Sequence, residues 1–487
     1  MVHAVHSKEI LTIFVFYIVI IFCVGFVALF KTKDLSDYIL GGRKLPAPIV
    51  GLGAGASDMS GWLLMALPGA IFVNGANYLW LPLGLSIGAF LNWLLVARRL
   101  RRFTEISNDS LTIPSYFDAR FQDRKKILRM VTAVVVLVFF TFYASAGFVA
   151  GGILSESLFH TSYFTGLCIS TAIIVGYTCI GGFLAISWID FFQGSLMLVA
   201  LVAVPVVTIF HIGGWQPFMH HLSANGHSYL NAFHGISAMG IFSLLAWGLG
   251  YFGQPHILVR FMAAKSPKVI PSAQVICVTW MILALYGAVF TGLSGNAFFH
   301  HLEKPESVFI ELAMVVFNPW IAGFLIAAVL SAIMSAVSAQ LLASSSALTE
   351  DLYRIINPSH RLRYKQIVRI ARLSLLLIAV IAFWLASRPD GTVLKLVSYA
   401  WAGLGASFGP LVLLSIYWKN MTRDSALIGM LVGAITVIVW EILDKHFGGF
   451  FHLYSMIPGF FLNVVAVLLV GKYQGNRTIP EIAEKLF

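Results

Sequence analysis

The chain has 487 residues, of which 59% are hydrophobic and only 11% are charged. Soluble domains carry charge on about a quarter of their residues, so this composition excludes a soluble protein and predicts an all-α integral membrane protein. The net charge of +11 does not indicate nucleic-acid binding, because the basic residues lie in short segments between apolar runs, where they set topology and contact anionic membrane lipid.

Apolar runs recur along nearly the whole chain, each close to the roughly 20 residues that a membrane-spanning helix needs. The first run has no small-residue cleavage site behind it, so we expect a retained span rather than a signal peptide. We predict about thirteen spans in a single membrane domain, residues 1–487. The spans cover residues 10–30, 48–73, 78–97, 127–153, 163–186, 192–212, 236–258, 273–296, 320–346, 367–387, 393–417, 424–442 and 450–471.

Basic residues predict the orientation of these spans, because cytoplasmic loops are enriched in Lys and Arg. With the N-terminus outside, the loop 213–235 is an outer loop and contains no basic residue. The outer segments then hold only five of the 32 basic residues: Lys8, Lys304, Arg388, Lys395 and Lys445. The alternation continues to the end of the chain and places the C-terminus inside.

The second span, GLGAGASDMSGWLLMALPGA (51–70), is crowded with Gly and Ser around Asp58. A carboxylate at mid-span costs at least about 2.5–3.5 kcal/mol, so it marks a functional site by default. Ionised it attracts a cation, and protonated it carries a proton; a structural acceptor that caps a broken helix is the alternative. With Ser57, Ser60 and Gly61 beside it, freed carbonyls and hydroxyls would form an oxygen cage suited to hard cations.

The seventh span contains WGLGYFGQPH (247–256), with three glycines and a proline. It lies five spans after the second, so the two interrupted helices cross the membrane in opposite directions. That arrangement is typical of inverted repeats in transporters. We expect one repeat of spans 2–6, residues 48–212, and one of spans 7–11, residues 236–417. The extra helices are then 10–30, 424–442 and 450–471.

Other polar side chains inside spans have two possible interpretations. Serines of the ninth span either bind a ligand or bond to their own helix; these are Ser331, Ser335 and Ser338. Aromatics with polar tips either line a pocket or belong to the core and interfacial belts; these are Trp62, Tyr143, Trp247 and Tyr251. No nucleophile–base arrangement, phosphate loop or metal-type cluster is visible, so no enzyme is expected.

Six longer strings resemble the sodium/solute symporter family, and most closely its proline-carrying members. They are SDYILGGR (36–43), GASDMSGWLLMALPGAIF (55–72), GYTCIGGFLAISWID (176–190), WGLGYFGQPHILVRFMAA (247–264), QLLASSSALTEDLYR (340–354) and AWAGLGASFGP (400–410). They occur in order along the chain, and the resemblance implies a LeuT-like fold with spans 2–6 and 7–11 as its inverted repeats.

The resemblance also implies site residues. Sodium would lie between spans 2 and 9, and Asp190 would belong to the ion pathway. The sodium ligands would be the carbonyls of Ala56, Met59 and Ala332 and the hydroxyl of Ser335, with Asp58 and Ser338 in support. The substrate would lie near Ser60, Gly61, Trp62, Tyr143, Trp247, Tyr251 and Pro255.

Ala336 departs from the family pattern, which usually has a second hydroxyl residue after Ser335. One oxygen ligand for sodium is therefore missing, which a water or Ser338 could replace. The resulting hypothesis is a symporter of the bacterial inner membrane that imports L-proline with sodium. Coupling to protons or to mixed ions is the alternative; a membrane proline sensor is a weaker one, because only the tail 472–487 follows the last span.

Overall fold

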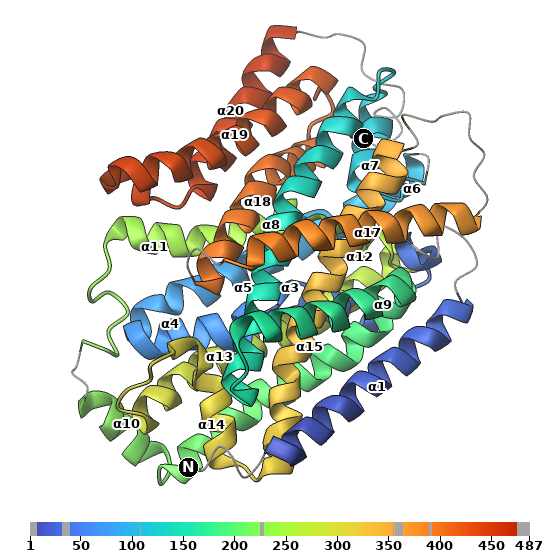
Figure 1. The fold of residues 1–487 in the computed structure, drawn as a ribbon. Coiled ribbons are helices and arrows are strands. Elements are labelled where there is room, and N and C mark those ends of the chain that lie inside the picture. Colours follow the sequence, from blue (N-terminus) through green and yellow to red (C-terminus); the bar gives the residue numbers. More distant parts are fainter. Residues whose placement is uncertain are drawn as a thin grey trace.

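The structure, a computed structural model, describes residues 7–31, 39–107, 109–224, 228–353, 355, 364–388 and 392–474. This part of the chain is helical, and the helices run past one another in a single bundle (Figure 1). Its first helices are α1 (Ser7–Lys31), α3 (Ala47–Asp58), α4 (Leu67–Asn74), α5 (Trp80–Asn92), α6 (Arg98–Ile106), α7 (Ile113–Phe121), α8 (Ile127–Phe159), α9 (Tyr163–His211) and α10 (Trp215–Ala224). These are followed by α11 (Ala238–Leu245), α12 (Pro255–Met262), α13 (Ile270–Phe298), α14 (Val308–Val316), α15 (Pro319–Ser346), α17 (Tyr364–Ala386), α18 (Val393–Tyr417), α19 (Arg423–Phe447) and α20 (Met456–Gln474).

Among the described residues, 11 helical stretches are long and apolar enough to cross a membrane. The expected spans that are not counted separately are the second and the seventh. The stretch Trp62–Ile106 joins the end of the second span to the third, and Ala238–Gly253 is an apolar helix that is too short alone. The breaks predicted from Gly and Pro shorten both spans, and the connection η3 (Gly75–Leu79) is itself helical, so the end of the second span runs on into the third.

The second span consists of α3, a non-helical step, the π-helical segment η2 (Trp62–Ala66) and then α4. The seventh consists of α11, the 3₁₀ segment η5 (Ala246–Gly253) and α12. Gln254 joins η5 to α12 in an extended conformation (φ −88°, ψ 107°), as expected for a residue before proline.

The fifth and sixth spans meet at Gly182, not in the expected loop 187–191. Gly182 has φ 62° and ψ −178°, a conformation that side chains disfavour, and α9 continues as helix on both sides of it. Consequently Asp190, which falls between the expected spans 163–186 and 192–212, lies inside the second half of α9 and is fully buried.

The centre of the bundle is formed by α15, which packs against α8, α9, α1 and α3. In its most apolar window 89% of the residues are buried, against 22% for α1 at the edge. The helices α19 and α20 pack mainly on each other and on α18, and lie along one side of the bundle (Figure 1). Small residues allow a close approach between α5 and η5: a Cβ on Gly88 would lie 2.1 Å from the Gly248 carbonyl oxygen.

Candidate functional site

The break in the second span redirects two backbone amides. Beyond Asp58 the chain leaves the helix at Met59 (φ −84°, ψ 87°). The Ser60 amide donates to the Asp58 carbonyl (3.1 Å) and the Leu63 amide donates to the Ser60 carbonyl (3.0 Å). In a continuous helix these amides would bond to Ala56 and Met59. The break therefore frees the two carbonyls that the sequence resemblance assigned to a sodium site.

Asp58 is the last residue of α3 and its side chain is only 1% exposed. Its Oδ2 accepts a hydrogen bond from the Tyr251 hydroxyl (2.6 Å), so the carboxylate joins the two broken spans. Its Oδ1 is buried and accepts no hydrogen bond from the described residues; His256 Nε2 lies 3.9 Å away. One carboxylate oxygen thus remains available in the centre of the bundle.

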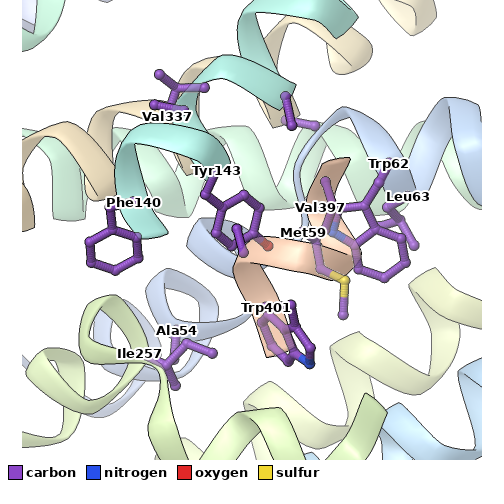
Figure 2. Packing of buried hydrophobic residues seen from close by; sticks show 14 of the residues in the cluster. Ala54, Met59, Trp62, Leu63, Phe140, Tyr143, Ile257, Val337, Val397 and Trp401 are labelled. Atoms are coloured by element: carbon purple, nitrogen blue, oxygen red, sulfur yellow. The ribbon is translucent and has the colours of Figure 1, made fainter. Parts of the chain in front are cut away.

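The predicted aromatic residues gather around this break. Trp62 donates from Nε1 to the Asp58 carbonyl (3.3 Å), and the rings of Tyr251 and Trp401 meet edge to face at 5.1 Å. Trp401 in turn donates to the Trp247 carbonyl (2.8 Å). Figure 2 shows Met59, Trp62, Tyr143 and Trp401 as members of one buried cluster.

The remaining predicted substrate residues lie at the two breaks. Ser60 is buried in the first break, and Pro255 begins α12 in the second. Gly61 has a packing role, because a Cβ there would lie 2.8 Å from the Ala150 Cβ and 3.0 Å from Ile333 Cγ1. A side chain at this position would push apart helices that the break requires to be close.

Asp190 and Ser335, predicted from separate motifs, are in contact. The Ser335 hydroxyl donates to Asp190 Oδ1 (2.5 Å), and Arg260 forms an ion pair with Asp190 Oδ2. Arg260 also donates to the Ser187 hydroxyl (2.7 Å). Ser338 donates back to the Ser335 carbonyl (2.9 Å), as serines in helices commonly do.

Sequence reasoning did not single out Trp401, Arg260 or Ser187. For Arg260 a signal existed, because a carboxylate such as Asp190 in an apolar run requires a nearby cation. The pairing of these two residues, 70 positions apart, is visible only in the fold. The contact of Trp401 with Tyr251 likewise had no local signal.

A narrow cavity extends from the second break toward the face predicted to be inner. Pro255, His256 and Arg260 line one part of it, and Thr112 and Asp351 line another. On the face predicted to be outer, an open hollow reaches Trp247. The two breaks therefore lie between spaces that approach them from opposite faces.

Comparisons with known proteins agree with this architecture. The chain is 50% identical over 451 residues to the high-affinity proline transporter PutP of Bacillus subtilis, covering 92% of this chain and 94% of the relative. It is 49% identical over 489 residues to a sodium/proline symporter of Escherichia coli, covering 98% and 96%.

Solved structures match in fold at low identity. A Na⁺-coupled sialic acid symporter in a substrate-bound outward-open state has a TM-score of 0.80 at 17% identity, covering 96% of this chain and 98% of that one. Mhp1, a nucleobase-cation-symport-1 family transporter, has a TM-score of 0.57 at 14% identity, covering 93% and 99%. The fold is therefore LeuT-like, and the chain is a multi-pass membrane transporter rather than an enzyme. A family model matches residues 38–433, and the chain belongs to the sodium:solute symporter family.

Proposed function

We propose that this protein imports L-proline together with sodium across the bacterial cytoplasmic membrane. The observation that carries the proposal is the break at Asp58, where two carbonyls lose their helical partners beside a buried carboxylate. The naming of several relatives as sodium/proline symporters, at 46–49% identity over nearly the whole chain, supports the choice of substrate and ion.

The sodium ion would bind between α3 and α15. Its ligands would be the Ala56, Met59 and Ala332 carbonyls and the Ser335 hydroxyl, with Asp58 and Ser338 in support. Because Ser335 donates its hydrogen to Asp190, the lone pairs of its oxygen remain able to face a cation. Ala336 is fully buried and supplies no oxygen from its side chain, so a water or Ser338 would complete the shell.

The proline molecule would lie in the aromatic cluster beside this ion. Its carboxylate would meet free backbone amides of the broken helices, and its ring would pack on aromatic faces. The residues that would line this pocket are Ser60, Gly61, Trp62, Tyr143, Trp247, Tyr251 and Pro255. Sodium would order the break and so raise the affinity for proline, and by reciprocity proline would raise the affinity for sodium.

After the ion leaves its site, Asp190 would guide it toward the inner face. The Asp190 carboxylate pairs with Arg260 and accepts one hydrogen bond from Ser335, which leaves further lone pairs on both oxygens able to face a cation. Movement of the repeats 48–212 and 236–417 within the single domain 1–487, with N-terminus outside and C-terminus inside, would expose the two faces in turn.

The test is uptake of radiolabelled proline by proteoliposomes containing the purified protein. An inward sodium gradient should drive accumulation above that seen with equal sodium on both sides. Equal uptake under both conditions would refute sodium coupling, and accumulation driven by a proton gradient alone would favour the proton-coupled alternative.

The proton-coupled alternative rests on Asp58 Oδ1, the buried oxygen that accepts no hydrogen bond from the described residues and is able to hold a proton. The sensor alternative predicts proline binding without net flux.

A further inference from the structure

The turn between α19 and α20 carries Tyr454, which contacts the candidate substrate site although it lies outside both expected repeats. The rings of Tyr454 and Trp247 stack with centroids 5.4 Å apart and planes 18° from parallel. Trp247 belongs to η5, the broken part of the seventh span. A helix pair at the side of the bundle therefore contacts the element that the proposed function places against the substrate (Figure 1).

Tyr454 is fixed at both ends. Its hydroxyl donates to the Ser398 carbonyl on α18 (2.9 Å), and its amide donates to the Ser243 hydroxyl on α11 (3.0 Å). The next residue, Ser455, donates to Glu441 Oε1 on α19 (2.8 Å). These bonds attach the turn to three helices and hold the ring against Trp247.

The stack continues inward through a chain of contacts. The Trp247 carbonyl accepts from Trp401 Nε1, the Trp401 ring meets the Tyr251 ring, and the Tyr251 hydroxyl donates to Asp58. A shift of Trp247 would therefore alter the groups that surround the break. Aromatic stacking of this kind restrains the ring more than area burial alone.

On its other side the stack of Tyr454 and Trp247 faces the open hollow on the face predicted to be outer. Trp247 and Tyr454 both line this hollow, together with Lys395, Glu441 and Asp444. The paired rings thus stand between this opening and the Trp401–Tyr251 contact.

We propose that Tyr454 is a positioning residue for substrate: its ring holds Trp247 in place as the outer wall of the substrate pocket. The α19–α20 turn, which lies outside both repeats, then contributes to the affinity for substrate and to its retention. This inference rests on the proposed function, because it takes the ligand beside Trp247 to be proline.

The test compares Tyr454→Phe, Tyr454→His and Tyr454→Leu with the wild type in proteoliposomes. Phe keeps the stacked ring and loses only the bond to Ser398, His keeps a smaller ring, and Leu has none. We expect the KM for proline to stay within about twofold for Phe and to rise about tenfold for Leu, with His between them. The maximal rate and the sodium dependence should change less than the KM.

The matched control is Phe450→Leu, an aromatic of the same turn that is 67% exposed and packs on Trp440 of α19. Its KM should equal that of the wild type. The double variant Tyr454→Leu/Trp247→Leu completes a double-mutant cycle. Its fold loss of proline affinity should be smaller than the product of the two single-variant losses, since each single change already breaks the stack.

A flat KM across the Tyr454 series would overturn this inference, as would a Phe variant as impaired as Leu. If the Leu variant does not accumulate in membranes, the KM values of the wild type and the Phe and His variants still test the expected order. A wild type that takes up no proline would instead refute the proposed function, so the two failures are distinguishable.

Discussion

The two oxygens of the Asp58 carboxylate have different environments. Oδ2 is held by Tyr251, whereas Oδ1 accepts no hydrogen bond from the described residues and lies 3.9 Å from His256 Nε2. A purely structural cap would be expected to satisfy both oxygens, because an unpaired buried acceptor costs about 1–3 kcal/mol. This asymmetry favours the functional interpretation of Asp58 over the capping alternative.

Replacing Asp58 by Asn should lower sodium-driven proline uptake by roughly 10- to 100-fold, because the amide keeps the shape but removes the negative charge that favours a cation. Initial rates in proteoliposomes measure the effect. Asp424→Asn, which changes a carboxylate that is 42% exposed, is the control and should transport normally. Full activity of the Asp58 variant would exclude a role for its charge.

Replacing Ala336 by Ser should restore the oxygen that the family usually has at this position. Ala336 is fully buried on α15 beside Ser335, and Ser adds a single atom to a tightly packed site. The sodium concentration for half-maximal uptake should fall about threefold to tenfold, because one added oxygen contact strengthens sodium binding by about that factor.

The control for that substitution is Ala339→Ser, one turn further along α15, where the side chain lines the inner cavity. It should leave the sodium dependence unchanged. The same sodium dependence in the Ala336 variant would show that a hydroxyl at this position does not face the ion.

At the scale of elements, the short helix α7 lines the narrow cavity near the face predicted to be inner. Thr112, its N-cap, donates to Asp351 Oδ1 (3.0 Å), and Arg129 of α8 donates to the same oxygen (2.7 Å). Asp351 belongs to η8 (Ala347–Tyr353), the π-helical end of the span that begins with α15. One carboxylate oxygen therefore joins three elements across the mouth of the cavity.

Asp351→Asn should weaken this closure, because the amide cannot form the ion pair with Arg129. In a variant whose four native cysteines are serine, a cysteine replacing Ala343 in the cavity wall should react with a maleimide several-fold faster when Asp351 is Asn. Glu105→Gln removes an ion pair with Arg101 at a carboxylate that is 58% exposed and should not change the rate. Equal maleimide reaction rates in the parent protein, the Asp351→Asn variant and the Glu105→Gln variant would contradict a closing role for Asp351.

At the scale of the whole molecule, the distribution of basic residues predicts which face is cytoplasmic. A cysteine replacing Lys445 near the end of α19 should react with a membrane-impermeant maleimide in intact cells. A cysteine replacing Lys125, just before α8, should react only after the membrane is opened. Labelling at position 125 but not at position 445 in intact cells would contradict the predicted orientation, with the N-terminus outside.

The sequence by itself determined that the chain crosses a membrane repeatedly, because hydrocarbon requires long apolar helices and leaves few places for charge. It also located both broken spans, since Gly and Pro interrupt helical bonding locally, and it marked Asp58 as an unusual carboxylate. These properties depend on residues close together in the chain.

The tertiary structure alone decided which distant residues meet. The bond of Tyr251 to Asp58, the ion pair of Arg260 with Asp190 and the stack of Tyr454 on Trp247 each join residues 70 or more positions apart. The boundary at Gly182 also required the fold, because an apolar run does not show where a helix turns back. Such contacts depend on which helices pack against one another, and the periodicity of a single helix does not specify its packing partners.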